Sequence, residues 1–523
     1  MVTRRRLLKG LLFGLGAKAA YASAPVEASS LIPQEQRAIH ALNRLAYGPR
    51  PADVAAIRLE GPAAWLNRFL EEQLDPQRLS EPVPLRARLE SLETLTLSQS
   101  ELLARFRKLL QAGNAASQGS ATAAAGADNT RDILAEARRE LIRPVVLQAA
   151  EARIVRAVES PAQLQEVLVD FWFNHFNVFV GKAPVSVLVG AYEREAIRPF
   201  VLGRFRDLLG ASAKHPAMLY YLDNAFSVKA GYRPPAAMLA NPNVVRPSGL
   251  NENYARELME LHTLGVDGGY SQQDVTELAR IFSGWTVNQR AARMGASGSL
   301  FLFDPARHDN APKQWLGRVI DGAGQAEGER ALDVLASHPS TARHLSFKLA
   351  QAFVADEPPP ALVARLAERF LQSDGDLKAV MQTLLSADEF WSVDAMGAKF
   401  KTPYQYFMSS LRGLGAGAPP EIPPMVQLLA QAGMPLYGAQ TPAGYKNTAS
   451  AWMHPEAIAQ RVQFSSNLAQ RRARQGHRID LDAQTLMDSL GPMLSATTRQ
   501  TVAAEPANTR LALLLASPDF MRC

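Results

Sequence analysis

The sequence predicts a mainly α protein, a large multi-helix array with a small β-hairpin or short-strand insertion near residues 285–320. Apolar residues recur at helical spacing in most windows, as Leu362, Leu366 and Phe370 do, and few stretches alternate. Recognisable helix start and stop signals separate these windows. With 47% hydrophobic and 20% charged residues, the chain of 523 residues can bury a large core.

The first 24 residues are predicted to be an export signal. Arg4 and Arg5 lie in the segment TRRRLLK, which has the form of a twin-arginine signal, and a moderately apolar stretch follows as far as Ala24. Lys18 and small residues interrupt that stretch, so it does not predict a stable transmembrane span. We expect export by the twin-arginine machinery to the periplasm or cell envelope. An uncleaved N-terminal anchor is the alternative.

The charge of the chain gives no reason to expect nucleic acid as a partner. Five basic residues precede residue 25 with no acidic residue among them, and the remaining 51 Lys and Arg nearly balance 50 Asp and Glu. Nucleic-acid binding depends on clustered cations that neutralise phosphates.

Cys523 is the only cysteine, which excludes cysteine-based zinc and iron–sulfur sites within one chain.

In chain order, the first helical patterns cover residues 39–45, 98–110 and 130–158. An Ala/Gly/Ser-rich segment, residues 112–129, is predicted to be a mobile connection between the last two. Pro216 and Pro339 each follow a histidine and indicate helix starts. On the second of these helices, His344 and Lys348 are four residues apart and are expected on a solvated face.

Capping residues mark further helices. Ser271 followed by Asp274 predicts a capping box, and Asp376 is expected to cap the helix that runs to residue 385. Gly265 and Gly284 are placed to end their helices. Trp285 and the aromatic residues after it stand among Gly, Ser and Pro, which indicates the β insertion.

The predicted domain organisation has four parts. The export signal, residues 1–24, precedes a main helical domain of residues 25–412. A Gly/Pro-rich linker of residues 413–424 then leads to a C-terminal helical subdomain of residues 425–523. No P-loop, G-x-S-x-G or H-E-x-x-H motif is present, so no motif of known geometry assigns a reaction.

Three short segments of the middle third carry histidines beside amides and carboxylates: residues 171–177, 251–262 and 307–309. If 251–262 is one helix, Asn251, Ala255, Leu258 and His262 form a stripe, so His262 faces inward or borders the core. Glu257 lies on the flank of that apolar face, where it could reach a neighbouring helix.

Two interpretations of these segments stay open. In the first, His175, His262, His308 and Asp309 bind a divalent metal or act with Glu257 as catalytic groups, which would make the protein a metal-dependent or His/carboxylate-based exported hydrolase. In the second, the segments form a buried structural hub of hydrogen bonds. The residues expected in that hub are Asn174, Asn177, Asn251, Asp223 and Asn224. The histidines lack local ligand spacing, which favours the hub.

Several motifs resemble one bacterial family, catalogued as domain of unknown function 1800. The most specific is NENYARELMELHTLGVDGGYSQQDVTELARIFSGW at residues 251–285. The others are FWFNHFNV at 171–178, REAIRPF at 194–200, HPAMLYYLDN at 215–224, HD at 308–309 and HPSTARHLSFKLAQAFV at 338–354. The resemblance extends over residues 39–464. It implies an exported protein and, as a partner, a co-exported protein of a family with a sulfatase-like or phosphatase-like fold.

This chain departs from the family pattern at two places. Ala311 stands where a glycine is common after the His-Asp pair. The late family motif appears only as residues 441–445, followed by Trp452. From the residues and the resemblance together, we expect an exported helical binding or assembly protein that acts with a co-exported partner, with the hydrolase as the alternative.

Overall fold

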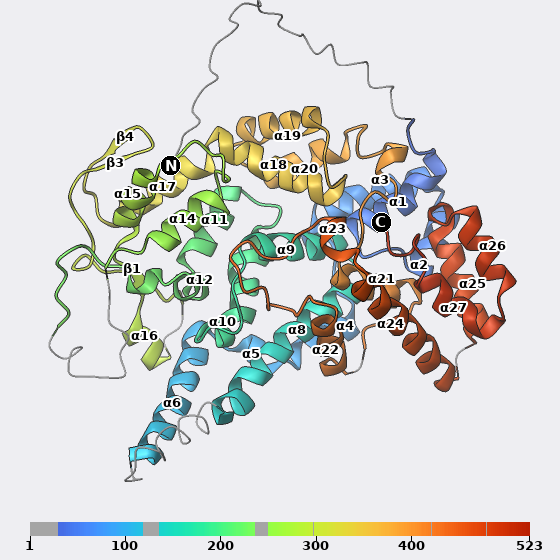
Figure 1. The fold of residues 1–523 in the computed structure, drawn as a ribbon, viewed down its shortest axis with the longest axis horizontal. Coiled ribbons are helices and arrows are strands. Elements are labelled where there is room, and N and C mark those ends of the chain that lie inside the picture. Colours follow the sequence, from blue (N-terminus) through green and yellow to red (C-terminus); the bar gives the residue numbers. More distant parts are fainter. Residues whose placement is uncertain (1–29, 119–134, 236–248, 296–297, 420, 477) are drawn as a thin grey trace, which may run out of the picture.

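A computed structural model describes residues 30–118, 135–235, 249–295, 298–419, 421–476 and 478–523. The predicted signal with Arg4 and Arg5 lies outside these residues, as does most of the predicted connection 112–129. Within the described residues the protein is mainly α, as the sequence predicts (Figure 1).

The N-terminal part is a succession of helices with short turns between them. They are α1 (Gln34–Leu45), α2 (Pro51–Glu60), α3 (Pro62–Gln73), the 3-10 turn η1 (Pro76–Arg78), α4 (Val83–Glu90), α5 (Glu93–Thr96) and α6 (Gln99–Gln118). The α6 helix is longer than the predicted 98–110, because alanine-rich residues that were expected in the connection continue it to Gln118.

The middle part supplies the helices that surround the centre of the molecule. They are η2 (Arg138–Ile142), α8 (Arg143–Glu159), α9 (Gln163–His175), α10 (Val185–Tyr192), η3 (Glu193–Ile197), η4 (Arg198–Phe200), α11 (Phe205–Lys214), α12 (Pro216–Tyr221), η5 (Asn224–Phe226), α14 (Glu252–Glu260), α15 (Gln272–Phe282), α16 (Gln289–Met294), α17 (Gln325–Ala336), α18 (Pro339–Phe353), α19 (Pro360–Gln372) and α20 (Leu377–Leu385).

The C-terminal part is again helical. It contains η6 (Val393–Ala395), α21 (Pro403–Gly413), α22 (Pro423–Gln431), α23 (Ala449–Trp452), α24 (Pro455–Arg474), α25 (Ile479–Leu490), η7 (Gly491–Met493), α26 (Ala496–Ala504) and α27 (Ala507–Leu515). Residues on both sides of 413–424 belong to one buried apolar cluster. The division into a main domain and a subdomain stays a prediction.

The strands form two small antiparallel sheets inside the predicted insertion. β1 (Trp285–Val287) pairs with β2 (Phe301–Phe303), and β3 (Lys313–Trp315) pairs with β4 (Arg318–Ile320). Trp285 and Trp315 are fully buried and anchor the sheets to the helical body. A Cβ at Gly328 on α17 would lie 2.2 Å from the Trp285 ring, so only glycine allows this close approach.

The predicted caps explain where several helices begin. Ser271 and Asp274 form the capping box of α15, and the Asp376 carboxylate accepts from the Ala379 amide at the start of α20. The imidazoles of His215 and His338 likewise accept backbone amides at the starts of α12 and α18.

The helix expected over 251–262 is shorter in the structure. Asn251 caps α14, but the helix ends at Glu260, and His262 lies in the turn that follows. His262 is nevertheless buried, and its backbone amide still donates to the Glu257 carbonyl oxygen. The turn continues to Gly265, whose φ of +86° is accessible mainly to glycine.

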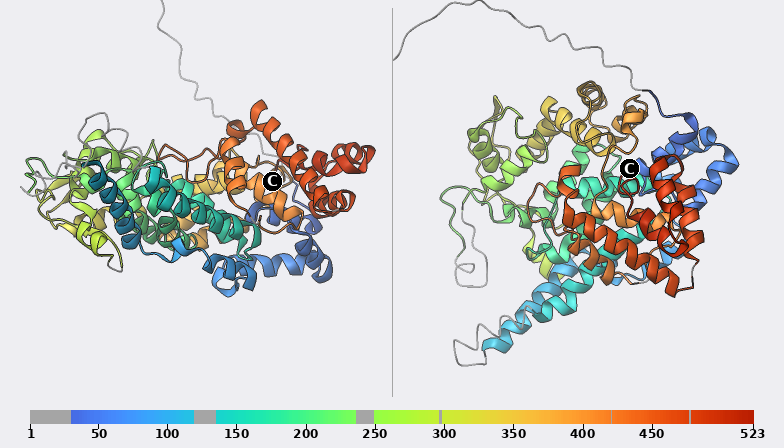
Figure 2. Two further views of the ribbon diagram at one scale, coloured as in Figure 1. Left: turned by 90° about the horizontal axis from the view of Figure 1, so that it is seen from below. Right: turned by 45° about the vertical axis from the view of Figure 1, so that its right-hand side comes forward.

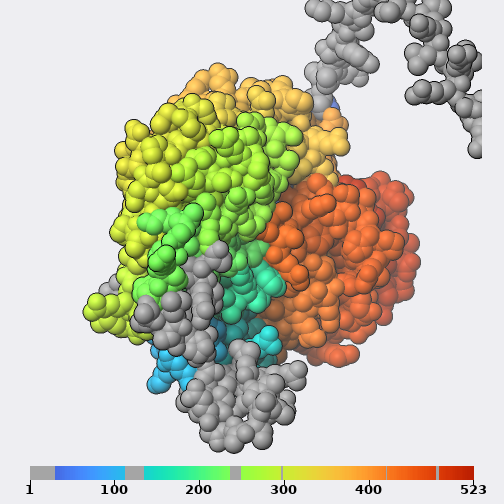
Figure 3. Space-filling model, turned by 60° about the vertical axis from the view of Figure 1, so that its left-hand side comes forward, coloured from blue at the N-terminus to red at the C-terminus, as the bar shows by residue number. Residues whose placement is uncertain are grey.

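The α9 helix lies near the middle of the fold (Figure 1). In Figure 1, α18, α19 and α20 lie above it and α24 to α27 form the right-hand end, while Figure 2 shows that the body is wider than it is thick. On the face in Figure 3, the part coloured green to yellow borders the C-terminal part, coloured orange to red.

None of the described helices has the length and apolar character that a membrane crossing requires.

Candidate functional site

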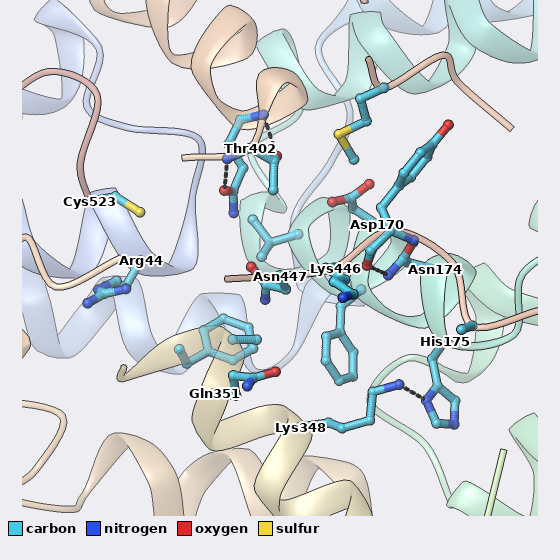
Figure 4. Close-up of a pocket in the computed structure, with 18 of the residues that line it drawn as sticks. Arg44, Asp170, Asn174, His175, Lys348, Gln351, Thr402, Lys446, Asn447 and Cys523 are labelled. Carbon is cyan, nitrogen blue, oxygen red and sulfur yellow. Dashed lines mark hydrogen bonds between the residues drawn. The ribbon is translucent and has the colours of Figure 1, made fainter. Parts of the chain in front are cut away.

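A cavity of about 200 Å³ lies where α1, α9, α18 and the segment 434–447 converge. It is smaller than the roughly 300–1,000 Å³ typical of sites for drug-sized ligands. Most of the residues that line it have polar side chains (Figure 4). Those used below are Arg44, Asp170, Asn174, His175, Lys348, Gln351, Lys446 and Asn447.

Two helices supply most of the functional groups. On α9, Asp170 and Asn174 are one helical turn apart, and His175 is the last residue of the helix. On α18, Lys348 and Gln351 reach the same cavity from the opposite side. Lys348, which was predicted on a solvated face, is half-buried. Leu345 and Leu349 are both buried, so Lys348 borders the inner face of α18.

Lys348 is hydrogen-bonded to His175. Its Nζ lies 2.9 Å from His175 Nδ1, and His175 Nε2 lies 3.1 Å from the carbonyl oxygen of His262 (Figure 4 shows the first contact). A carbonyl oxygen only accepts hydrogen bonds, so Nε2 must carry the ring hydrogen and Nδ1 must be the acceptor. The His262 carbonyl thus fixes the imidazole in the tautomer that accepts from the amine.

Three histidines surround Lys348, and we call the four residues together the Lys348 cluster. The His175 ring centroid lies 6.1 Å from that of His262 and 6.2 Å from that of His344. Burial, and secondarily the Lys348 charge, lowers the pKa of His175 well below its usual range, that of His262 to about 3 and that of His344 to about 4. At neutral pH the three imidazoles are therefore uncharged.

The cationic charge of Lys348 has no counter-ion in the described chain. Within the described residues no carboxylate comes within ion-pair distance of its Nζ, and burial alone lowers its pKa to about 8. The one carboxylate side chain that lines the cavity, Asp170, pairs with the buried Arg153. Arg44, which interacts with Cys523, and the exposed Lys446 are two further cations at the cavity wall. The cavity is therefore electropositive.

The amides of α9 hold the late segment against the cavity. Asn174 Nδ2 donates to the carbonyl oxygen of Tyr445 at 2.8 Å, and the Tyr445 amide donates back to Asn174 Oδ1 at 2.7 Å. Asn177 Nδ2 donates to the carbonyl oxygens of Ala439 and Thr441. Gly444 has a φ of +67°, and a Cβ there would lie 2.4 Å from the Asn174 carbonyl oxygen. The motif at 171–178 and the divergent motif at 441–445 thus meet at one wall.

The other residues of the expected hub bond to backbone groups elsewhere. Asn251 Nδ2 donates to the Leu222 carbonyl oxygen at 2.6 Å, and Asn224 Nδ2 donates to the carbonyl oxygens of Phe282 and Trp285. Asp223 adopts a φ of +62° and accepts from Lys182 Nζ at 2.7 Å. Asn251, Asp223 and Asn224 thus hold the turn at residues 222–224.

His308 belongs to a second cluster, formed with Lys313 and Glu327 and here called the Glu327 cluster. His308 Nε2 lies 3.1 Å from Glu327 Oε1, and Lys313 pairs with Glu327 Oε2. All three side chains are fully buried. The neighbouring Asp309 pairs with Arg280 at 2.8 Å. The structure brings His175 and His262 together, but His308 and Asp309 have their own partners.

The four predicted metal candidates do not share one centre. No group of three or more His, Cys, Asp or Glu side chains in the described part of the chain is arranged to hold a metal ion. Glu257 is half-buried, and burial, with a smaller effect of Glu260, raises its pKa.

The sequence did not reveal Lys348 and Asp170 as site residues. For Lys348, the available signal was its position between Leu345 and Leu349, two core residues of one helix.

Comparison with protein families matches residues 40–522 to the family described as "Protein of unknown function (DUF1800)". The chain belongs to this family. The DUF1800 match covers nearly the whole chain and includes both the Lys348 cluster and the Glu327 cluster. No curated protein and no solved structure matches the chain.

Proposed function

We propose that this DUF1800 protein is an exported binding protein that holds a small oxyanion, a carboxylate or phosphate group, in the cavity beside Lys348. The observation that carries the proposal is a half-buried lysine that lines a small cavity and has no carboxylate of the described residues within ion-pair distance. Removing a charge from water is costly unless a partner compensates it, and an anionic ligand would supply that partner. Asn174, Gln351 and Asn447 offer further hydrogen-bonding groups along the wall.

The hydrolase hypothesis has less support. His308 and Glu327 resemble an acid/base pair, but both side chains are fully buried, so a substrate has no route to them. His175 reaches the cavity, yet its second ring nitrogen faces a backbone carbonyl instead of an orienting carboxylate. The geometry therefore favours binding over hydrolysis.

We expect replacement of Lys348 to weaken anion binding. Lys348→Met should weaken the binding of inorganic phosphate or glycolate at least tenfold, because a hydrogen bond to a charged group contributes about 1.5–3 kcal/mol. Lys348→Arg should retain most of the affinity, and Lys446→Met, which removes an exposed charge, should change it little. Isothermal titration calorimetry of the mature protein would measure these affinities. Equal affinities for wild type and Lys348→Met would contradict the proposal.

The affinity should also depend on pH. The anion binds the protonated amine, so affinity should be full below about pH 8 and fall as pH rises through the pKa of Lys348. Lys348→Arg should lack this decline, because a guanidinium stays charged throughout that range.

Export is the second part of the proposal and rests on the sequence of the leader. Replacing Arg4, Arg5 and Arg6 together with lysine should retain the protein in the cytoplasm, whereas Lys18→Arg should leave export intact. Fractionation and immunoblotting would measure the distribution. Normal export of the triple variant would contradict the twin-arginine prediction.

The third part is an exported partner with a sulfatase-like fold, which the family resemblance suggests. Stoichiometric co-purification of such a chain from the exported fraction would support it. Recovery of the mature protein alone under gentle conditions would count against a stable complex.

A further inference from the structure

The Lys348 amine is held in one orientation. Its Nζ lies 2.9 Å from His175 Nδ1, and the His262 carbonyl keeps the hydrogen of that ring on Nε2. His175 itself is fixed by edge-on contacts with Trp172 and Phe176. The imidazole therefore presents a lone pair to one N–H of the amine, and the Lys348 side chain also lines the cavity (Figure 4).

None of the three imidazoles around the amine carries a negative charge that would favour its protonated form. His175 faces it from α9, His262 from the turn after α14, and His344 from its own helix, and burial lowers the pKa of each. Arg44, which interacts with Cys523, and Lys446 are the other cations that line this cavity. Two buried lysines near carboxylates are paired: Lys313 with Glu327 and Lys399 with Asp356. The half-buried Lys348 has no such partner in the described part of the chain.

A desolvated amine is a better nucleophile at neutral pH than an ordinary lysine. With a pKa of about 8 in place of 10.5, the unprotonated fraction of Lys348 at pH 7 is roughly 300-fold larger. Lys401 has a pKa lowered to about 8 as well, but it is buried outside the cavity, and its Nζ donates to the Phe520 carbonyl oxygen at 2.8 Å. Access to the cavity therefore distinguishes Lys348 from Lys401.

We propose that Lys348 is a carbonyl-reactive amine, and that the ligand of this cavity is a small oxo acid whose aldehyde or ketone carbon forms an imine with Lys348 Nζ. The inference rests on the proposed function, since the oxyanion of the ligand is what brings its carbonyl group to the amine. A cavity of about 200 Å³ corresponds to roughly seven water molecules, which suits an acid of a few carbon atoms.

The reaction needs no further reactant. The unprotonated amine attacks the carbonyl carbon, the C–N bond forms, and the carbonyl oxygen takes up a proton to give a carbinolamine. Loss of that oxygen as water then leaves a protonated imine. Overall, an ammonium group and a carbonyl group give a protonated imine and one water, with no change in charge. His175 Nδ1 acts as a positioning group, because it holds one N–H and so directs the nitrogen lone pair away from the ring.

Reductive trapping tests the inference. The mature full-length protein is incubated with glyoxylate and sodium cyanoborohydride, which reduces an imine to a stable secondary amine, and peptide mass spectrometry locates the adduct. We expect one adduct, at Lys348, whose rate of formation rises with pH up to about 8. An excess of glycolate, which has the carboxylate but no carbonyl, should slow it at least tenfold. Labelling of Lys446 or Lys401 as fast as Lys348 would overturn the inference.

Two variants separate this inference from the proposed function. Lys348→Arg keeps the charge, so it should still bind glycolate but form no adduct at this position. Lys348→Met should lose both. If wild type binds glycolate in a Lys348-dependent manner and glyoxylate leaves Lys348 unmodified, the imine inference fails and the anion site stands. If glyoxylate modifies Lys348 but glycolate neither binds nor competes, the oxyanion site fails, and the inferred ligand class fails with it.

Discussion

Glu327→Gln is expected to destabilise the protein by about 3–5 kcal/mol. Glu327 pairs with Lys313 and lies 3.1 Å from His308 Nε2, and all three side chains are fully buried. Glutamine preserves the shape but removes the negative charge, which leaves the Lys313 ammonium buried without a counter-ion. Chemical denaturation of the mature protein at pH 7 would measure the change in the free energy of unfolding.

The same helix provides the matched control. Glu329 on α17 pairs with two cations, Arg206 and Lys214, but it is partly exposed. Glu329→Gln should therefore cost less than about 1 kcal/mol. Replacing Lys313 and Glu327 together with methionine should recover much of the loss, because an apolar pair leaves no buried charge. A cost for Glu327→Gln as small as that for Glu329→Gln would contradict this account.

The Glu327 cluster also predicts a loss of stability in acid. Burial would raise the pKa of Glu327, but hydrogen bonds from His308 and Lys313 outweigh it, and the net pKa lies below its usual 4.5. A carboxylate with a depressed pKa stabilises the fold above its unfolded value and loses that contribution as pH falls through the folded value. Below about pH 4.5, the stability difference between wild type and Glu327→Gln should therefore shrink.

Local features of this fold could be predicted from the sequence because their physical causes are local. The capping box at Ser271 and the cap at Asp376 depend on contacts three residues apart. The helical period and the aromatic residues among glycines likewise indicated the class and the insertion. Helix ends were less predictable: α14 stops at Glu260, before the expected histidine.

The site could be predicted only in part, because its contacts join residues far apart in the chain. His175 and His262 were identified as candidates and do lie together. Their partner Lys348 is 173 residues from His175, and Tyr445 is 271 residues from Asn174. Periodicity shows which face of a helix is buried, but it does not show which distant segment will cover that face. For the same reason, the sequence did not show that His308 pairs with Glu327.

The second large effect is expected at Arg153, behind the cavity wall. Its buried guanidinium pairs with Asp170 and lies 3.3 Å from Glu193 Oε2, and it lies against the rings of Phe173, Tyr404 and Tyr437. Arg153→Met should therefore destabilise the protein by about 3–5 kcal/mol, because it leaves the partly buried Asp170 carboxylate without its ion pair and removes aromatic contacts.

Loss of Arg153 should affect Asp170 more than Glu193. Glu193 keeps Arg198, 3.4 Å away, and the hydroxyl of Tyr437, whereas Asp170 has no second ion pair among the described residues. Burial already raises the pKa of Asp170, although Arg153 opposes that rise. Adding Asp170→Asn to Arg153→Met should therefore restore part of the lost stability, with a coupling of about 1–3 kcal/mol in a double-mutant cycle. Additive losses would contradict the pairing.

The same pair controls the charge of the cavity. Without Arg153, Asp170 faces Lys348 across a small cavity as an unpaired carboxylate, or takes up a proton. In the ionised case it competes with an anionic ligand for the ammonium group, so Arg153→Met should weaken glycolate binding, and Asp170→Asn on that background should restore it. Calorimetric titration of the single and double variants would measure this effect. Unchanged affinity in Arg153→Met would indicate either that Asp170 takes up a proton when Arg153 is lost or that the anion lies away from α9.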